Sequence, residues 1–327
     1  ARENSYKRAL TECLEKETHY RNEAEGLKNY IRENFTNEKV YADFLSALGV
    51  SLENEEDKIN TLREQALDIQ NVKQRAVFLQ EKISDLSLQS EKLSLLKNIF
   101  EGEKCYVLSC GPSLTEHDQA KVANLLENNL VVSIKQAYDL FSTLTDFHVY
   151  NCANFKKYDY AHHRPLVMEA STTPFKLGEC DLKFFIRERN FDNSVAEKKN
   201  FDDWTLDKQP MLRPYGPGIM YEAVFYLLQH LGVSEVVTIG WDNKLVSSEA
   251  GKQHFYDKED SEFDKAEFIH SNEVANNDNA VKTLSHEEKI TTNAIGIWYT
   301  WLKENGCTLK IISPYNPAPD NIERVEI

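Results

Sequence analysis

Several short motifs in this 327-residue chain place glycine, serine or a carboxylate directly after an apolar run. The first is Gly111-Pro112-Ser113, which follows the run 104–109. Glycine permits a tight turn close to a ligand, and a serine hydroxyl with the following amides can bind phosphate or cap a helix. The motif therefore predicts a phosphate contact, with a purely structural strand-to-helix turn as the alternative.

A second candidate loop, rich in glycine and proline, stands directly before an apolar helical segment. Its candidate ligand contacts are Arg213, Tyr215, Gly216, Pro217 and Gly218. Amides at the start of a helix attract anions, and an arginine can pair with a phosphate or a carboxylate. We expect an anion contact here, unless the loop serves only as a helix-entry turn.

Polar side chains also follow three other apolar runs. Lys135 and Gln136 come after the run 130–134, and Asn151 comes after 147–150. Lysine can neutralise phosphate, whereas Asn151 can pair with a base or ribose edge or close an Asx-turn. Asp242, after the run 235–239, could bind a hydroxyl, act on a proton or serve as a nucleophile.

A long acidic segment, about 244–284, lacks strong periodicity and is typical of a lid or acceptor-binding insertion. His286 follows the segment, just before a predicted helix, and could act as a general base near neutral pH. A lone histidine is more often structural, which is the alternative here.

The elements that must position these residues alternate between short apolar strands and helices. We expect strands at 104–109, 130–134, 147–150, 182–186, 235–239 and 308–312, with helices at 219–231 and 290–304 among those between them. This alternation predicts an α/β, Rossmann-like, mostly parallel sheet with helices on both faces and a lid insertion. In such sheets ligands lie beyond the carboxyl ends of the strands.

Residues 1–100 form a separate segment in the sequence, with two glycines and no proline. Apolar residues spaced three and four apart between Ile59 and Leu93 predict a helical, coiled-coil-like arm, with an antiparallel helical hairpin as the other structure that fits this stripe. The arm would serve homo-oligomerisation or partner docking, or would pack on its own domain. The Rossmann-like domain is expected to span 101–327.

Composition excludes several classes of function. A net charge of −15 argues against nucleic-acid binding, although a local basic pocket remains compatible with it. The six cysteines show no C-x-x-C pair and are typical of reduced thiols, which favours a cytoplasmic location. No run is long and apolar enough for a membrane helix. Because the chain starts with Ala1, it is interpreted as a candidate fragment of a longer protein.

Taken together, the motifs resemble bacterial family-42 sialyltransferases and their relatives, which include flagellin nonulosonic-acid and some Kdo transferases. The family's G-N-G-P-S-L is similar to 110–114, its Tyr-Asn pair to Tyr150-Asn151, and its T-S-G-V-Y loop to 216–220. Its S-G-I-D is similar to 239–242, its histidine before the last helix to His286, and its C-P-N roughly to 313–316. The likeness covers 104 to about 317 and leaves out the arm.

The resemblance implies a CMP-activated acidic keto-sugar as donor (Kdo, sialic or pseudaminic type) and a glycan or protein hydroxyl as acceptor, in surface-glycan assembly. Gly111, Ser113, Asn151 and 216–218 would surround CMP, and His286 would deprotonate the acceptor. No cofactor or metal is expected. In a retaining enzyme Asp242 would be the nucleophile.

The chain departs from the family pattern at four places. Cys110 stands where the family has asparagine, Lys135 or Gln136 where it has another asparagine, and Pro217 where it has a serine that contacts phosphate. The family's lid tyrosines, which aid phosphate departure, have no aligned counterpart, and Tyr256 is the nearest candidate for such a substrate contact. Two other functions stay open. The G-P-S-L and G-x-D motifs also resemble pterin pyrophosphokinase-like proteins, which would use ATP and Mg²⁺. The non-enzymatic alternative is a helical scaffold that carries a degenerate nucleotide fold.

Overall fold

A computed structural model describes residues 52–151, 156–171, 176–185, 205–207, 218–242, 254–257 and 292–327. The chain divides into two compact units, Ala1–Thr61 and Leu62–Ile327. Within the first unit only 52–61 are described, as part of helix α4 (Leu52–Asp68). The remainder of the predicted arm before residue 52 lies outside the described residues.

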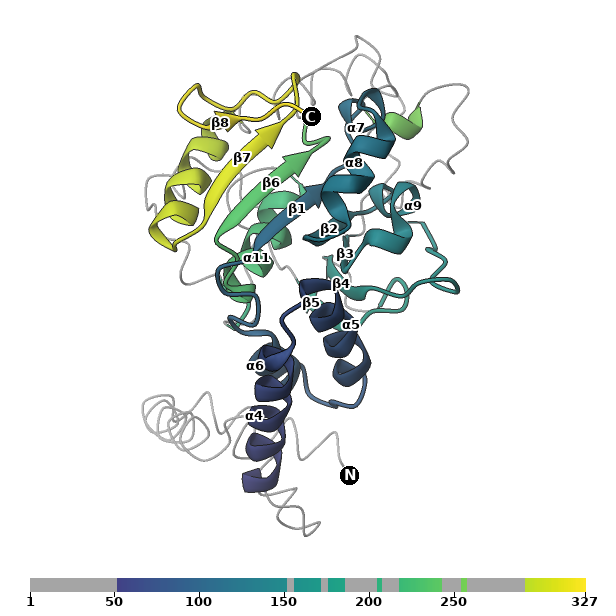
Figure 1. Cartoon of the computed structure of the whole chain (residues 1–327), viewed down its shortest axis with the longest axis vertical. Coiled ribbons are helices and arrows are strands. Elements are labelled where there is room, and N and C mark those ends of the chain that lie inside the picture. The colour runs from purple at the N-terminus through teal and green to yellow at the C-terminus, as the bar shows by residue number, and fades with distance from the viewer. Residues whose placement is uncertain are drawn as a thin grey trace, which may run out of the picture. The chain divides into compact units, whose positions relative to one another are not determined.

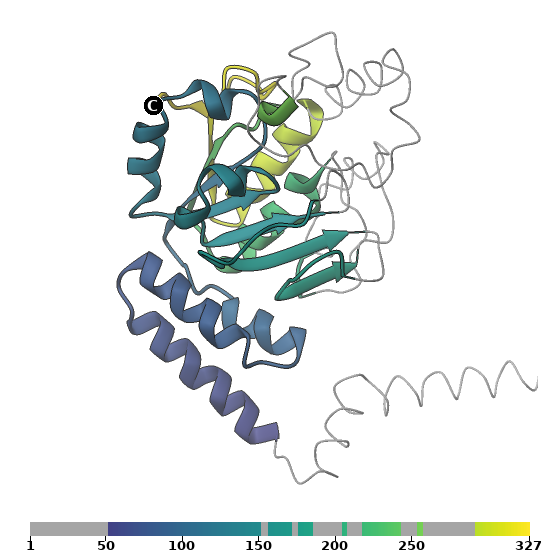
Figure 2. The ribbon, with the colours of Figure 1, turned by 90° about the vertical axis from the view of Figure 1, so that its right-hand side faces the viewer.

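The second unit is an α/β, Rossmann-like domain built on one sheet in which every described pairing is parallel (Figures 1 and 2). The strand order is β5-β4-β3-β2-β1-β6-β7-β8. The strands are β1 (Lys104–Leu108), β2 (Leu130–Ile134), β3 (Phe147–Tyr150), β4 (Leu166–Ser171), β5 (Leu182–Phe185), β6 (Glu235–Ile239), β7 (Thr308–Ile312) and β8 (Glu323–Arg324). Central strands such as β2 are buried along their whole length, as expected when helices cover both faces.

Two sets of helices cover the sheet. The first set comprises α5 (Val72–Ile83), α6 (Gln89–Leu96), the π-helical turn η3 (Met220–Val224), α11 (Phe225–Leu231) and the helix at 292–304. Their apolar side chains share one core with Cys105, Val107 and Val132 of the strands. The alternate strand residues Tyr106, Leu108 and Val131 pack with α7 (Ser113–Glu116) and α8 (Gln119–Leu126). The short helices α9 (Ala137–Leu140) and η1 (Ser142–Leu144) connect β2 to β3.

Helices α5 and α6 belong to the same compact unit as the sheet, although the sequence placed them in a separate arm. Leu79 and Leu95 are completely buried in the core that also holds the strand residues. From Leu62 onward, the narrow apolar stripe is therefore the face of a helical layer that covers the sheet. The predicted boundary at residue 100 differs from the observed division after Thr61.

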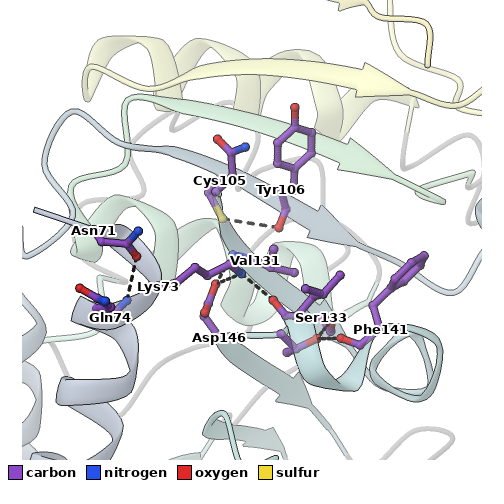
Figure 3. A network of polar contacts seen from close by, with 12 residues as sticks. Asn71, Lys73, Gln74, Cys105, Tyr106, Val131, Ser133, Phe141 and Asp146 are labelled. Atoms are coloured by element: carbon purple, nitrogen blue, oxygen red, sulfur yellow. Dashed lines mark hydrogen bonds and ion pairs between the residues drawn. The ribbon is translucent and has the colours of Figure 1, made fainter. Parts of the chain in front are cut away.

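A buried polar network ties α5 to the central strands (Figure 3). Lys73 Nζ donates to Asp146 Oδ2 at 2.7 Å and to the Leu144 carbonyl at 2.6 Å. The Val131 amide donates to the same Asp146 oxygen at 2.8 Å. Burial raises the pKa of Asp146 to about 6, against the opposing effect of Lys73. The carboxylate thus connects the start of β3, the start of β2 and a helix from the amino-terminal part of the chain.

Candidate functional site

The sheet has a topological switch point between β1 and β6. From β1 the chain builds strands β2 to β5 outward on one side, and it then returns to build β6 to β8 on the other side (Figure 1). A crevice outside the carboxyl ends of the two strands is where open α/β sheets bind their ligands. The turns after β1 and β6 carry Gly111–Ser113 and Gly240–Asp242, so the switch point brings together two of the predicted motifs.

Asp242 is the residue on which the turns after β1, β6 and β7 converge. The Ser113 amide donates to Asp242 Oδ2 at 2.9 Å, and the Ser113 hydroxyl donates to Oδ1 at 2.5 Å. The Ser313 hydroxyl donates to the same Oδ1, also at 2.5 Å. Asp242 is 3% exposed. A buried carboxylate with both oxygens engaged clamps the turns together, and the nucleophile role, expected only for a retaining enzyme, stays a prediction.

Gly111 makes this convergence sterically possible. Its amide donates to the Gly240 carbonyl at 2.8 Å. A Cβ at position 111 would overlap the carboxyl group of Asp242 and the Gly240 carbonyl oxygen. The sequence attributed this glycine to the approach of a ligand, whereas the structure shows the approach of another turn of the same chain.

The amides of the turn after β1 donate within the protein. Besides those of Gly111 and Ser113, the Leu114 amide donates to the Gly111 carbonyl at 3.1 Å and the Thr115 amide to the Pro112 carbonyl at 3.2 Å. The helix that follows, α7, has four residues and a correspondingly small dipole. The expected phosphate contact through these amides therefore does not fit this conformation. The alternative interpretation, a structural strand-to-helix turn, accounts for the hydrogen bonds of these amides.

The turn after β7 is braced in the same way. Asn316 Nδ2 donates to the Trp241 carbonyl at 2.5 Å, next to Asp242. The guanidinium of Arg324, on β8, donates to the carbonyls of Ser313 and Asn316 at 2.9 Å each. The carboxyl-terminal segment thus holds Ser313 against the central carboxylate.

A second group of predicted residues lies at the carboxyl ends of β2 and β3. Lys135 directly follows β2 in a left-handed conformation with φ of 48°. Gln136 is completely buried, and Asn151, directly after β3, is 4% exposed. The Cys110 thiol donates to the carbonyl of Ile134 at 3.2 Å, so that the ends of β1 and β2 are in contact. Lys135, Gln136 and Asn151 thus follow neighbouring strands at the edge that carries the switch point.

One described part of the predicted lid reaches this edge. The Phe255 amide donates to the Cys110 carbonyl at 3.0 Å, and Phe255 and Tyr256 are buried with the residues of β1 and α7. The ring of His254 stacks on Tyr256, with centroids 4.8 Å apart and planes 8° from parallel. Tyr256 was predicted as a substrate contact. The residue before it, Phe255, is held directly beside the turn after β1 by its backbone hydrogen bond.

The glycine-proline loop is only partly described. Arg213, Tyr215, Gly216 and Pro217 lie outside the described residues, as does His286. Gly218 has a φ of 85° and leads into the π-helical turn η3. Tyr221 in that turn lies against Trp241, with ring centroids 5.8 Å apart. The end of the predicted loop therefore opens a helix next to the turn that carries Asp242.

Sequence reasoning missed the positioning residues of the site. Ser313 and Asn316 were noted only as a motif after the last strand, and Arg324 was not noted at all. Serine after a buried strand was a signal that could have identified Ser313 in the same way as Ser113. No pattern in the sequence identifies the role of Arg324. Its guanidinium group donates to three backbone carbonyls of a turn, and a backbone carbonyl, unlike a charged side chain, leaves no signal in the sequence.

No group of histidine, cysteine or carboxylate side chains suited to a metal ion occurs in the described part of the chain. Among the described helices, none has the length and apolar character to cross a membrane. No protein-family model matches the chain, and no curated protein matches it with significant similarity.

Proposed function

We propose that the domain binds a CMP-activated acidic keto-sugar at the carboxyl edge of its sheet and transfers the sugar to a glycan or protein hydroxyl. The observation that carries the proposal is the switch point between β1 and β6. Polar residues that follow β1, β2, β3 and β6, together with Tyr256, lie along this edge. The motifs follow one another in the order found in the CMP-sugar transferases that the sequence resembles. We therefore choose CMP among the nucleotides.

The proposed roles follow from the place of each residue at this edge and, for Asp242, from its contacts. We assign the positive charge of Lys135 to the donor phosphate, because the amides of the turn after β1 already donate hydrogen bonds within the protein. Gln136, Asn151 and Tyr256 are assigned to the nucleoside. Asp242 is assigned to positioning, because its two oxygens accept three hydrogen bonds inside the protein.

With Asp242 in that role, the favoured reaction is direct displacement with inversion. His286, assigned by the resemblance, takes the proton of the acceptor hydroxyl. The acceptor oxygen bonds to the anomeric carbon as the bond to the phosphate oxygen breaks, and CMP leaves with the electron pair. A lid that excludes water would protect the oxocarbenium-like centre.

Ligand titration tests the proposal. Thermal unfolding is measured with CMP, CDP, ATP, and ATP with Mg²⁺. Cytidine phosphates should stabilise the protein, by about 2.7 kcal/mol at a hundred times the dissociation constant. Stabilisation by ATP with Mg²⁺ alone would favour a pyrophosphokinase-like enzyme, and no shift with any nucleotide would favour the scaffold. Replacement His286→Ala should abolish transfer while CMP affinity stays within a few-fold.

A further inference from the structure

Lys135 has a backbone conformation that its residue type disfavours. Of the residues that the structure describes, only Lys135 and Asn98 combine a side chain with a positive φ, of 48° and 54°. Asparagine tolerates the left-handed region because its short side chain bonds locally, whereas lysine has no such compensation. The cost is on the order of 1 kcal/mol, and strain of this kind persists where surrounding contacts impose it.

Three hydrogen bonds impose the conformation on Lys135. Its amide donates to the Val149 carbonyl of β3 at 3.0 Å. Its carbonyl accepts from the Tyr138 amide at 3.1 Å and from His148 Nε2 at 3.0 Å. The strand that carries His148 thus fixes the residue that ends the neighbouring strand.

The hydrogen bonds of His148 define its tautomer. A carbonyl oxygen only accepts, so Nε2 carries the proton that is donated to Lys135. Nδ1, in a neutral ring, then accepts from the Tyr160 hydroxyl at 2.7 Å. Burial lowers the pKa of His148 to about 3, so the ring is neutral at physiological pH.

Aromatic rings hold the imidazole in place. His148 is completely buried. The Tyr138 ring stacks on it at 4.8 Å and 22°, and the Tyr158 ring meets it edge-on at 4.4 Å and 87°. A histidine confined in this way is suited to hold a backbone group and not to exchange protons with a substrate.

Lys135 stands at the end of β2, next to the turn that follows β1. The Cys110 thiol donates to the carbonyl of Ile134, the residue before Lys135. Burial raises the pKa of the Cys110 thiol to about 12, and the positive charge of Lys135 opposes this rise. Lys135 therefore follows directly on a backbone carbonyl that the turn after β1 contacts, at the edge where the donor is proposed to bind.

We infer that His148 is a positioning residue, which through its Nε2–H bond to the Lys135 carbonyl holds Lys135 in the left-handed conformation that directs its ammonium group to a phosphate. The ligand class is a nucleoside phosphate, and the inference rests on the proposed function. It explains why a lysine stands where glycine or asparagine would fold with less strain. It also assigns a role to the aromatic cluster around His148.

The test compares the affinity for CMP with that for cytidine, by calorimetric titration, because the two ligands differ only in the phosphate. The substitution Lys135→Asn removes the charge, and asparagine tolerates the left-handed backbone at this position. It should therefore weaken CMP binding about tenfold and leave cytidine binding unchanged. Lys121→Asn, which removes an exposed charge from α8, is the matched control and should change neither affinity.

The His148 variants test the positioning step. His148→Phe keeps the charge of Lys135 but loses the Nε2–H donor, and it should also lower the ratio of CMP to cytidine affinity. His148→Gln keeps an amide N–H donor and should recover most of that ratio, which a purely structural role does not predict. Tyr160→Phe disturbs only the hydrogen bond to Nδ1 and should give an intermediate ratio in a folded protein.

The outcomes separate this inference from the proposed function. Equal CMP affinity of wild type and Lys135→Asn, or an unchanged ratio in His148→Phe, overturns the inference and leaves CMP binding in place. If wild type binds neither CMP nor cytidine, the proposed function fails. Titration with inorganic pyrophosphate then decides the inference, since binding that Lys135→Asn weakens would support it and no such binding would overturn it.

Discussion

Replacement of Asp242 by asparagine and by alanine should affect stability very differently. Asparagine can direct its carbonyl oxygen to the Ser113 amide and its amide group to the hydroxyls of Ser113 and Ser313, which can reorient to accept. All three contacts survive and only the charge is lost. Alanine leaves the three donors without their common acceptor.

The expected magnitudes follow from these contacts. A buried donor left unpaired costs about 1–3 kcal/mol, and the Ser113 amide, unlike the two hydroxyls, cannot rotate to another partner. With the lost packing of a carboxyl group that is 3% exposed, we expect Asp242→Ala to lower the free energy of unfolding by about 4 kcal/mol. Asp242→Asn should lower it by about 1 kcal/mol.

Guanidinium denaturation measures both free energies, and the CMP-induced shift in melting temperature reports on the site. Asp320→Ala, at an exposed carboxylate, is the control and should stay within about 0.5 kcal/mol of wild type. If Asp242 is a clamp, Asp242→Asn keeps most of the transfer activity. A nucleophile would instead lose its activity on this substitution with the fold intact, and equal unfolding free energies of the asparagine and alanine variants would refute the clamp.

Three further predictions concern residues that support the site and the fold. Gly111→Ala should cost about 1–3 kcal/mol in the same denaturation assay, because the new Cβ would overlap Asp242; wild-type stability would contradict the close approach. Lys73→Met should cost about 3 kcal/mol because it leaves Asp146 buried without its partner, and adding Asp146→Asn should recover part of the loss; strict additivity in this double-mutant cycle would count against the pair. The pKa of Asp146 is raised from 3.8 to about 6, so the folded state binds the proton of this carboxyl group more tightly than the unfolded state does. Between pH 4 and 6 the wild type should therefore lose stability relative to Asp146→Asn as pH rises. If the unfolding free energies of the two proteins change in parallel with pH, the pKa shift is refuted.

The sequence was sufficient to predict the sheet wherever a strand is a short apolar run. The six strands expected from such runs are present, at 104–108, 130–134, 147–150, 182–185, 235–239 and 308–312. Strand β4 was not predicted, because Glu169 and Ser171 interrupt its apolar pattern. Both are buried, and Lys183 on β5 pairs with Glu169 and donates to Ser171. A cross-strand pair of this kind hides a polar residue in a core without leaving a local pattern.

The candidate site was predictable in position but not in detail. The rule that ligands bind at the carboxyl ends of strands correctly brought Ser113 and Asp242 to one edge. The sequence could not show that they bond to each other, since 129 residues separate them and either one could equally have faced a ligand. Likewise, a positive φ at Lys135 had no local signal, because His148 on the next strand imposes it.

The central place of β1 also has a consequence for synthesis of the chain. Strand β1 pairs with β2 on one side, but its other partner, β6, begins 131 positions later, at Glu235 against Lys104. While the ribosome is still adding the residues between them, β1 is an unprotected edge with the apolar sequence of a core strand. The nascent protein must therefore avoid self-association until β6 emerges and covers that edge.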